Sequence, residues 1–472
     1  MRAIGSLICG VALAAVGLGV AAQDALRPDQ VAFRGLYKEL VETNTTLSSG
    51  SCTLAAERMA ARLKAAGYAD ADITMFSVPE HPKDGGLVAI LPGSDAKARP
   101  ILLLAHIDVV EAKREDWVRD PFTLIEENGF FYARGAADDK SMAAIFTDAM
   151  VRLKAEPRLK HTLKLALTCG EETNGAFNGA EWLSLNRRQL IDAAFALNEG
   201  GGGRLDADGK PQMLSVQVAE KTYQDFTLEA RNPGGHSSVP RADNAIYELA
   251  DALEKVRGLK FAVHLNPTTQ AFFAKTATLA GVPQSLAQAM AAIAANPSDK
   301  LADSALSRDP TFNSTLRTTC VATLLEGGHA QNALPQRAKA NVNCRIVPGE
   351  TIEQTRQALI EAIGDSGVSV TANVHHGPIG QPAPLDPAIF GPAEKLAAEM
   401  FPGLAMVPSM STGASDSIYI SAAGIPSYGA PGILHESDGG GVHGLNEHVR
   451  VNALYKGRDY LYRLIKIYAS AP

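Results

Sequence analysis

The sequence predicts an α/β protein in which a mostly parallel sheet with flanking helices is interrupted by a smaller α+β domain. Three observations carry this prediction: strand-like runs alternate with helical patterns early in the chain, a β-α-β-β-α-β order follows, and the α/β pattern then returns. The chain has 472 residues, of which 46% are hydrophobic and 20% charged. These values are typical of globular proteins and exclude a disordered or fibrous chain.

The first part of the chain supplies the alternation. Apolar residues at helical spacing predict helices at 30–44, 54–66 and 140–154, and short apolar β-rich runs predict strands at 86–91, 101–107, 161–168 and 193–197. Parallel strands need crossover connections, which are usually helices. The pattern therefore predicts a largely parallel sheet.

The middle of the chain has a different pattern. From about residue 221, strands are predicted at 222–230, 316–325, 338–347 and 368–374, with helices at 244–256 and 351–363. This order is typical of a small antiparallel sheet with helices on one face. The alanine-rich stretch 268–303 predicts an insertion of two or three helices. After residue 384, helices at 392–400 and 452–468 indicate a return to the first domain.

These patterns predict two domains. The larger is built from residues 23–220 and 384–472, and the smaller spans 221–383 with a helical insertion at about 266–305. Residues 1–22 form a separate segment.

The N-terminal segment resembles a secretory leader. Arg2 precedes an unbroken run of small and apolar residues that ends in Val20-Ala21-Ala22, so we expect a signal peptide cleaved before Gln23. An uncleaved anchor is the alternative, since about 20 apolar residues can span a bilayer. Cleavage predicts an exported, periplasmic or secreted protein with no stable membrane insertion.

Charge and cysteine content restrict the partners. Lys plus Arg is 44 and Asp plus Glu is 51, giving a net charge of −7 without basic runs, which disfavours nucleic acid or anionic lipid as a partner. Cys52, Cys169, Cys320 and Cys344 remain after the leader, and their spacing fits no metal or disulfide framework. Cys320 and Cys344 could bridge neighbouring strands, but we favour buried thiols.

Acidic and histidine residues follow the predicted strands of the larger domain. Carboxyl ends of strands in an open α/β sheet are where ligands gather. Each residue alone has an ordinary explanation, such as helix capping for an aspartate. The candidate ligands are His106, Asp138, Glu172, Glu199 and His443, with Asp108 and Glu171 one step away.

Two imidazoles and three carboxylates without a thiolate suit a pair of divalent cations that share a bridging carboxylate. Zn²⁺ is the first choice, with Co²⁺ or Mn²⁺ as alternatives. Without cations, so many carboxylates in one cleft would be unstable at neutral pH. The sequence therefore predicts a dinuclear metal centre.

The ordered motifs resemble those of the M20 metallopeptidases over about residues 67–468. They are H-x-D, R-G-x-x-D-x-K, G-E-E, N-E-G, G-G-H-S and H-G-x-N-E. The family includes carboxypeptidases, aminoacylases and dipeptidases, with a dinuclear metal catalytic domain and a smaller lid or dimerisation domain. The resemblance implies one zinc held by His106, Asp138 and Glu199, and another held by Asp138, Glu172 and His443. Asp138, rather than Asp139, would bridge them.

The resemblance also implies roles for the remaining candidates. Asp108 would orient His106, and Glu171 would be the general base. His236 would be a lid histidine that supports the developing oxyanion, brought across by domain closure or by a second subunit.

Asn332 and Arg345 would contact a substrate carboxylate, although an arginine within a strand could equally be a solvated surface residue. Residues 412–416 could line the pocket. His375 and His376, at a strand end of the smaller domain, are expected to lie away from the site.

We therefore expect a metal-dependent hydrolase that cleaves an amide bond in small peptides, as carboxypeptidases and dipeptidases do. An N-acyl-amino-acid amidohydrolase is the alternative, because both reactions use the same catalytic parts. A non-catalytic binding protein of the same fold would have lost a ligand or the base, and none is missing. A homodimer is possible, since many relatives pair through the smaller domain.

Overall fold

The computed structural model describes residues 26–173, 177–206, 208–375 and 377–472. The expected leader at 1–22 lies outside these residues. Among the helices of the described part, none combines the length and the apolar character needed to cross a membrane.

The core of the larger domain is a six-stranded sheet in the order β1-β2-β6-β3-β7-β17. Its strands are β1 (Ile73–Val78), β2 (His81–Leu91), β3 (Ile101–His106), β6 (Leu163–Thr168), β7 (Phe195–Asn198) and β17 (Ser427–Gly429). The pairs β6-β3, β3-β7 and β7-β17 are parallel, whereas β1-β2 and β2-β6 are antiparallel. The sheet therefore has the parallel centre that the sequence predicts.

Helices cover both faces of this sheet. Successive residues of a strand point to opposite faces, so alternate residues of β3 pack against different sets of helices. Leu103 and Ala105 pack into the core formed with α1 (Pro28–Val41), α2 (Cys52–Ala65), α3 (Lys140–Lys154), α12 (Pro387–Met400) and α14 (Val451–Ser470). Leu102 and Leu104 pack into the core formed with α4 (Gly179–Asn186), α5 (Arg188–Ile191) and α13 (Ser417–Ala422). The α/β class is confirmed.

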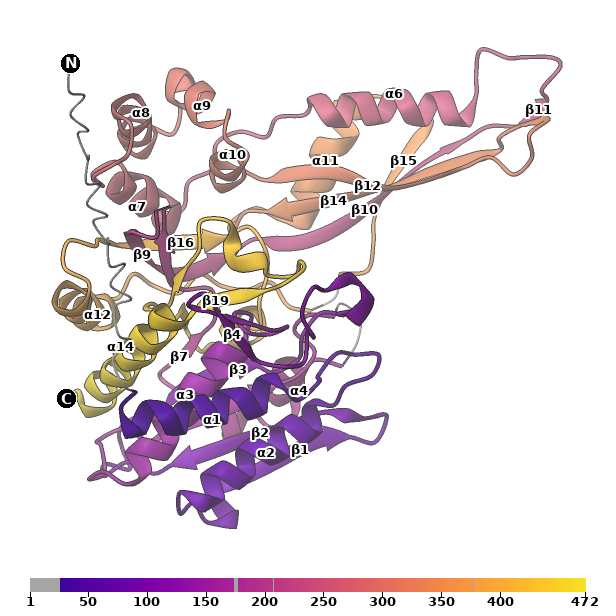
Figure 1. Ribbon diagram of the computed structural model, residues 1–472. Helices are drawn as coiled ribbons and strands as arrows, with labels where there is room; N and C mark the ends of the chain where they lie inside the picture. The colour runs from indigo at the N-terminus through magenta and orange to yellow at the C-terminus, as the bar shows by residue number, and fades with distance from the viewer. Residues whose placement is uncertain (1–25, 174–176, 207, 376) are drawn as a thin grey trace, which may run out of the picture.

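Two further sheets complete the larger domain, and the sequence patterns did not predict them. One has the order β16-β9-β8-β18 and consists of β8 (Gly202–Leu205), β9 (Pro211–Glu220), β16 (Met406–Ser411) and β18 (Leu434–His435). The other joins β4 (Ile125–Glu127), β5 (Phe130–Tyr132) and β19 (His448–Arg450). Short 3-10 helices are η1 (Asp70–Asp72), η2 (Arg114–Asp116) and η3 (Gly439–Gly441). Since β16 and β17 pair with β9 and β7, both ends of the chain build one domain (Figure 1).

The smaller domain is an antiparallel sheet in the order β12-β14-β10-β15. Its elements are β10 (Thr222–Arg231), α6 (Ala245–Gly258), β12 (Thr319–Gly327), β14 (Arg337–Ile346), α11 (Ile352–Ile363) and β15 (Val368–Ala372). Both helices pack against the same face of the sheet. At the far tip, β11 (Gly235–His236) pairs with β13 (Ala333–Leu334), remote from the larger domain (Figure 1).

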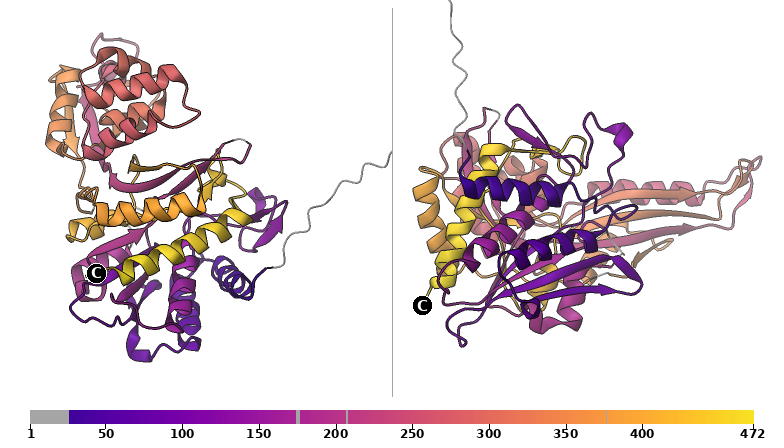
Figure 2. Two further views of the ribbon diagram at one scale, coloured as in Figure 1. Left: turned by 90° about the vertical axis from the view of Figure 1, so that its left-hand side faces the viewer. Right: turned by 60° about the horizontal axis from the view of Figure 1, so that its bottom comes forward.

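Three helices lie where the sequence predicts an insertion of two or three, at about 266–305, and a fourth follows them. They are α7 (Pro267–Thr276), α8 (Gln284–Ala295), α9 (Lys300–Leu306) and α10 (Pro310–Leu316). Asp309 caps the fourth helix, α10, by accepting bonds from the N–H groups of Thr311 and Phe312. The strand expected at 316–325 therefore begins only at Thr319. The four helices form a bundle above the larger domain (Figure 2), where α7 contacts β16.

The described residues form two disulfides, Cys52–Cys169 and Cys320–Cys344. The preferred interpretation of Cys320 and Cys344 as thiols was wrong, and the cross-strand alternative is correct. These two residues lie directly opposite each other on β12 and β14. Spacing gave no signal for Cys52–Cys169, because that pair depends on the packing of α2 beside the end of β6.

Candidate metal centre and substrate cleft

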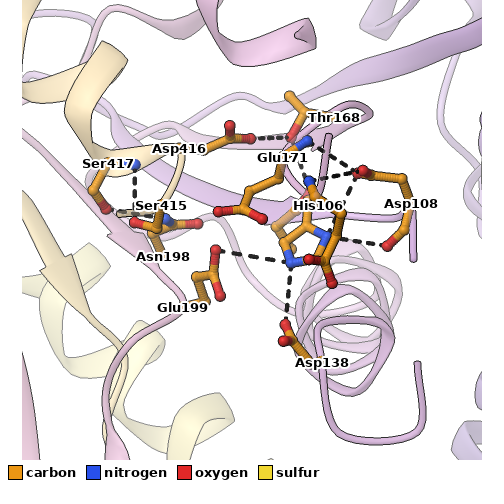
Figure 3. Close-up of polar contacts among 12 residues, drawn as sticks. His106, Asp108, Asp138, Thr168, Glu171, Asn198, Glu199, Ser415, Asp416 and Ser417 are labelled. Carbon is orange, nitrogen blue, oxygen red and sulfur yellow. Dashed lines mark hydrogen bonds and ion pairs between the residues drawn. The ribbon is translucent and has the colours of Figure 1, made fainter. Parts of the chain in front are cut away.

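Three parallel strands bring most of the candidate side chains to one edge of the central sheet. β3 ends at His106, β6 ends two residues before Gly170-Glu171, and β7 ends one residue before Glu199. His106 lies beside Thr168 in the β3-β6 register. Figure 3 shows Glu171 and Glu199 reaching towards the imidazole of His106 from neighbouring strand ends.

Asp138 lies between the two imidazoles. Its Oδ1 is 3.2 Å from Nε2 of His106, and its Oδ2 is 3.2 Å from Nε2 of His443. His443 Nε2 is also 2.9 Å from an oxygen of Glu172, and His106 Nε2 is 3.8 Å from Oε1 of Glu199. The five candidate ligands thus form two groups that share Asp138.

Glu447 holds the turn that carries Asp138. Its carboxylate accepts hydrogen bonds from the backbone N–H groups of Gly135, Ala137 and Asp138, at 2.8–3.0 Å. Buried Arg134 pairs with the same carboxylate at 2.8 Å. Sequence reasoning gave neither residue a role, although both stand in the quoted motifs. The available signal was an arginine in one of these motifs and a glutamate in the other.

Asp108 supports two parts of the site at once. His106 Nδ1 is 3.1 Å from the Asp108 carbonyl oxygen and 3.5 Å from its Oδ1. The Asp108 carboxylate also accepts the backbone N–H groups of Glu171 at 3.4 Å and Glu172 at 3.1 Å. Asp108 therefore orients His106 and holds the loop of the two glutamates.

Burial governs the protonation of these groups. It raises the pKa of Glu199 and of Glu171 well above the usual range, and mutual repulsion raises that of Glu171 further. Burial lowers the pKa of His106, but Glu199, Asp108 and Asp138 more than offset it and leave the value raised. Hydrogen bonds with Asp138 and Glu172 raise the pKa of His443 to about 10. The carboxylates thus favour a positive charge on the groups that lie between them.

The donor set fits divalent cations. Ligand atoms of His106, Asp138 and Glu172 lie within 4.8 Å of one another, as do those of His106, Glu171 and Glu199. Among the described residues, Glu199 Oε1 is buried without a hydrogen-bond partner. A buried carboxylate oxygen without a donor is costly unless a cation occupies its free side. Imidazole nitrogens and carboxylate oxygens are ligands that Zn²⁺ accepts.

A cleft of about 690 Å³ opens between the two domains beside this cluster. Glu171, Glu172 and His443 line it from the larger domain. The smaller domain contributes, among others, Tyr223 and Arg345, which face each other across β10 and β14 on the face opposite the helices.

The cleft also contains residues from the two segments set aside or left open above. Gly413–Asp416 line it, and so does His375. The expectation that His375 lies away from the site was wrong, because the chain after β15 returns to the larger domain along the cleft wall. His376 lies outside the described residues.

His236 and Asn332 are not in the cleft. Both are exposed at the tip of the smaller domain, where the N–H of Ser237 donates to the carbonyl of Asn332 at 3.0 Å. His236 Nδ1 contacts the Ser238 hydroxyl at 2.7 Å. The structure thus brings Arg345 to the cleft but leaves His236 and Asn332 remote from it within one chain.

Two further carboxylates, Asp416 and Glu220, lie in the wall of the cleft. Asp416 accepts hydrogen bonds from Thr168 at 2.9 Å and Asn178 at 2.7 Å, and burial raises its pKa to about 6. Glu220 accepts the N–H of Ser415 at 3.1 Å, and burial raises its pKa to about 7. Asp416 stood in a segment that the sequence analysis singled out, whereas Glu220 had no signal.

Comparison with known proteins decides the family. The model of the peptidase family M20/M25/M40 matches residues 102–467. The chain belongs to this family.

Similarity to individual proteins supports the assignment to the M20 family. The human N-fatty-acyl-amino acid synthase/hydrolase PM20D1 is 28% identical over 390 residues, covering 80% of this chain and 75% of the relative. A probable carboxypeptidase S-like 2 of Dictyostelium discoideum is 28% identical over 387 residues, covering 79% and 72%. The M20 metallo-carboxypeptidase Sso-CP2 of Sulfolobus solfataricus has the same fold, with a TM-score of 0.68, 19% identity, and coverage of 94% of this chain and all of that chain.

This M20 protein is therefore a metal-dependent peptidase or amidohydrolase that acts on amide bonds.

Proposed function

We propose that this protein is an exported dinuclear-zinc hydrolase that cleaves peptides at an amide bond close to a free carboxylate. The observation that carries this proposal is the placement of Arg345 in the same cleft as Glu171 and His443. A guanidinium binds a carboxylate through two parallel hydrogen bonds. A substrate held in this way would present a nearby amide to the metal ligands.

The five ligands His106, Asp138, Glu172, Glu199 and His443 would hold two cations, which would polarise the scissile carbonyl and lower the pKa of a water. Glu171 lies in the cleft but outside the two expected ligand sets. Its carboxylate would take a proton from the attacking water and deliver it to the departing amine. Asp108 keeps Glu171 in place through the backbone N–H bond described above.

An N-acyl amino acid is the second candidate substrate, and two observations favour it. The human relative is named for N-fatty-acyl amino acids. In addition, Val374, Pro378, Ile418 and Tyr419 contribute apolar and aromatic side chains to the lining of the cleft. Both substrate classes offer an amide beside a free carboxylate, so Arg345 and Glu171 serve either one.

Export is proposed from two independent features. Residues 3–22 have the composition of a signal peptide. The Cys52–Cys169 and Cys320–Cys344 disulfides suit an oxidising compartment, such as the periplasm or the medium.

A homodimer would explain why His236 lies at an exposed tip. β12 is an edge strand of the smaller domain, and Val321, Leu324 and Leu325 on it are 60–72% exposed. Exposed apolar edge strands are prone to pair with another chain. We therefore propose that a second copy docks along this domain and supplies His236 to the site of its partner.

Metal analysis combined with a hydrolysis screen tests the function. We expect about two equivalents of divalent metal per chain, hydrolysis of dipeptides or N-acyl amino acids, and a kcat/KM about 10- to 100-fold lower for the same compounds with the carboxylate amidated. Chelation should abolish activity and zinc should restore it. Full activity in metal-free protein would contradict the proposal. Comparing N-acetyl and N-fatty-acyl amino acids with dipeptides of the same C-terminal residue separates the two substrate classes.

A further inference from the structure

The loop that carries Glu171 begins at a covalent bond. Pairing of β6 with β3 ends at Thr168, and the next residue, Cys169, is joined to Cys52, the first residue of α2. The two cysteines are 117 residues apart in sequence, and both are buried. Glu171 follows only two residues later, and Glu172 three.

Besides the Asp108 bonds, backbone contacts hold the described part of the chain beyond Cys169. The carbonyl of Cys169 accepts the N–H of Gly179 at 2.7 Å, and that of Gly170 accepts the Asn178 amide at 3.2 Å. Gly170 has φ +94°, and an added Cβ would come within 1.8 Å of the Phe177 carbonyl oxygen. These contacts join the two ends of the loop to each other, and the disulfide joins its first residue to α2.

The disulfide also packs against the residue that organises the site. Ligand atoms of Cys52, Cys169 and Asp108 lie within 4.8 Å of one another. The Asp108 carboxylate accepts the N–H groups of Glu171 and Glu172 and lies beside His106. Two thiols in place of the disulfide would be free to move and would offer S–H donors beside this carboxylate.

We infer that the Cys52–Cys169 disulfide is a positioning element of the active site, which holds the Glu171–Glu172 loop and Asp108 in their working geometry. This inference rests on the proposed function, in which Glu171 is the general base. Full activity then requires that this disulfide, which ends two residues before Glu171, is oxidised.

The other disulfide is a matched control. Cys320–Cys344 joins β12 and β14, which are already hydrogen-bonded along their length, in the smaller domain. Neither of its cysteines lines the cleft. A general requirement for cross-links would affect both pairs, whereas a positioning role would affect only Cys52–Cys169.

The test compares the double variants Cys52→Ala/Cys169→Ala and Cys320→Ala/Cys344→Ala at 25 °C with saturating zinc. In the first, kcat should fall about tenfold or more, because small displacements of a catalytic group have large effects on rate. KM should change less than about threefold, since Arg345 is untouched. The control should keep the wild-type kcat. A first variant with lowered Tm but kcat within about twofold of wild type would overturn the inference.

A second measurement does not depend on turnover. Hydrogen exchange of peptides that contain Glu171 and Glu172 should be faster in the Cys52→Ala/Cys169→Ala variant and unchanged in the control. If the wild-type protein hydrolyses no amide, the proposed function fails. Faster exchange confined to this loop would still show that the Cys52–Cys169 disulfide positions it. Unchanged exchange in the loop would overturn the positioning role of the disulfide, whatever the substrate.

If the first variant does not fold, the bond can be reduced in folded protein. In the Cys320→Ala/Cys344→Ala background, a water-soluble phosphine supplies two electrons, and the disulfide takes these with two protons to give two thiols. The phosphine gains an oxygen atom from water and becomes its oxide. The fraction of Cys52–Cys169 reduced, measured by thiol alkylation and mass spectrometry, should match the fraction of kcat lost. Full activity in fully reduced protein would overturn the inference.

Discussion

The guanidinium carbon of Arg345 lies 4.7 Å from the centre of the Tyr223 ring. Tyr223 is itself fixed, because its hydroxyl donates to Asp225 at 2.7 Å, and Asp225 accepts further bonds from Asn341 and Asn343. Stacking on an aromatic face suits a planar guanidinium, which then keeps its hydrogen-bonding edge available. This arrangement makes Arg345 a pre-oriented site for a carboxylate on the cleft wall.

Replacement of Arg345 by alanine should weaken binding of substrates that carry a free carboxylate. A hydrogen bond to a charged group contributes about 1.5–3 kcal/mol, which corresponds to a loss of about 10- to 100-fold in kcat/KM, mostly through KM. Steady-state kinetics on a substrate and its C-terminal amide measure this effect. Tyr223→Phe keeps the ring and should retain most of the activity. Equal losses on both substrates in Arg345→Ala would contradict the assignment.

Glu171→Gln should separate catalysis from metal binding. The amide keeps the size of the side chain but cannot accept a proton, so kcat should fall about 10²- to 10⁴-fold. Metal content should stay at the wild-type level, because Glu171 is not among the five expected ligands. Metal analysis and kcat on the same preparation provide the measurement. Wild-type turnover would remove Glu171 as the base, and loss of metal would make it a ligand.

Asp138→Asn and Asp139→Asn form a matched pair at adjacent positions. Asp138 faces both imidazoles with its two oxygens, whereas Asp139 is buried and has an oxygen without a hydrogen-bond partner among the described residues. We expect Asp138→Asn to lose metal and reduce kcat about 10³-fold or more, because the amide is a poor bridge between two cations. Asp139→Asn should retain metal. The reverse result would make Asp139 the bridging residue.

The sequence predicted the parts of this protein that depend on local pattern. The α/β class, the strands β3, β6 and β7, and the gathering of His106, Glu172 and Glu199 at one sheet edge all follow from periodicity and from strand direction. The sequence did not predict the sheet that contains β9. Its four strands come from residues 202–220 and 406–435, and such long-range pairing leaves no local signal.

Other features required tertiary contacts for a similar reason. The Glu447–Arg134 pair joins residues 313 positions apart, and the Cys52–Cys169 disulfide joins residues 117 positions apart. The position of His375 on the cleft wall depends on the path of a linker. By contrast, Cys320–Cys344 could have been predicted more firmly, since strands β12 and β14 were both expected and only their register was unknown.

The raised pKa of Glu220 predicts that the stability difference between Glu220→Gln and wild type depends on pH. Burial raises its pKa from 4.5 to about 7, so its contribution to stability is fully present below pH 4.5 and is lost as the pH rises towards 7. Gln at this position stays neutral. The Tm of Glu220→Gln minus that of wild type, both metal-free, should therefore increase between pH 5 and pH 8 by a few degrees. A difference that is constant with pH would place the titration elsewhere.

The exposed position of His236 leads to a test of how the site is completed. His236→Ala and Glu171→Gln should each be nearly inactive. If a second subunit supplies His236, a mixed dimer contains one site with Glu171 from one chain and His236 from the other. Random exchange of subunits then gives half mixed dimers with one working site each, or roughly a quarter of wild-type activity.

The mixing experiment distinguishes the two routes that bring His236 to the cleft. If closure of one chain delivers its own His236, every site in the mixture lacks either the base or the histidine, and activity stays at the level of the separate variants. Leu324→Arg on the exposed edge strand is the companion variant, since a charge there should disfavour pairing through β12. Gel filtration should then give a monomer, and the mixture of the two inactive variants carrying this change should no longer recover activity.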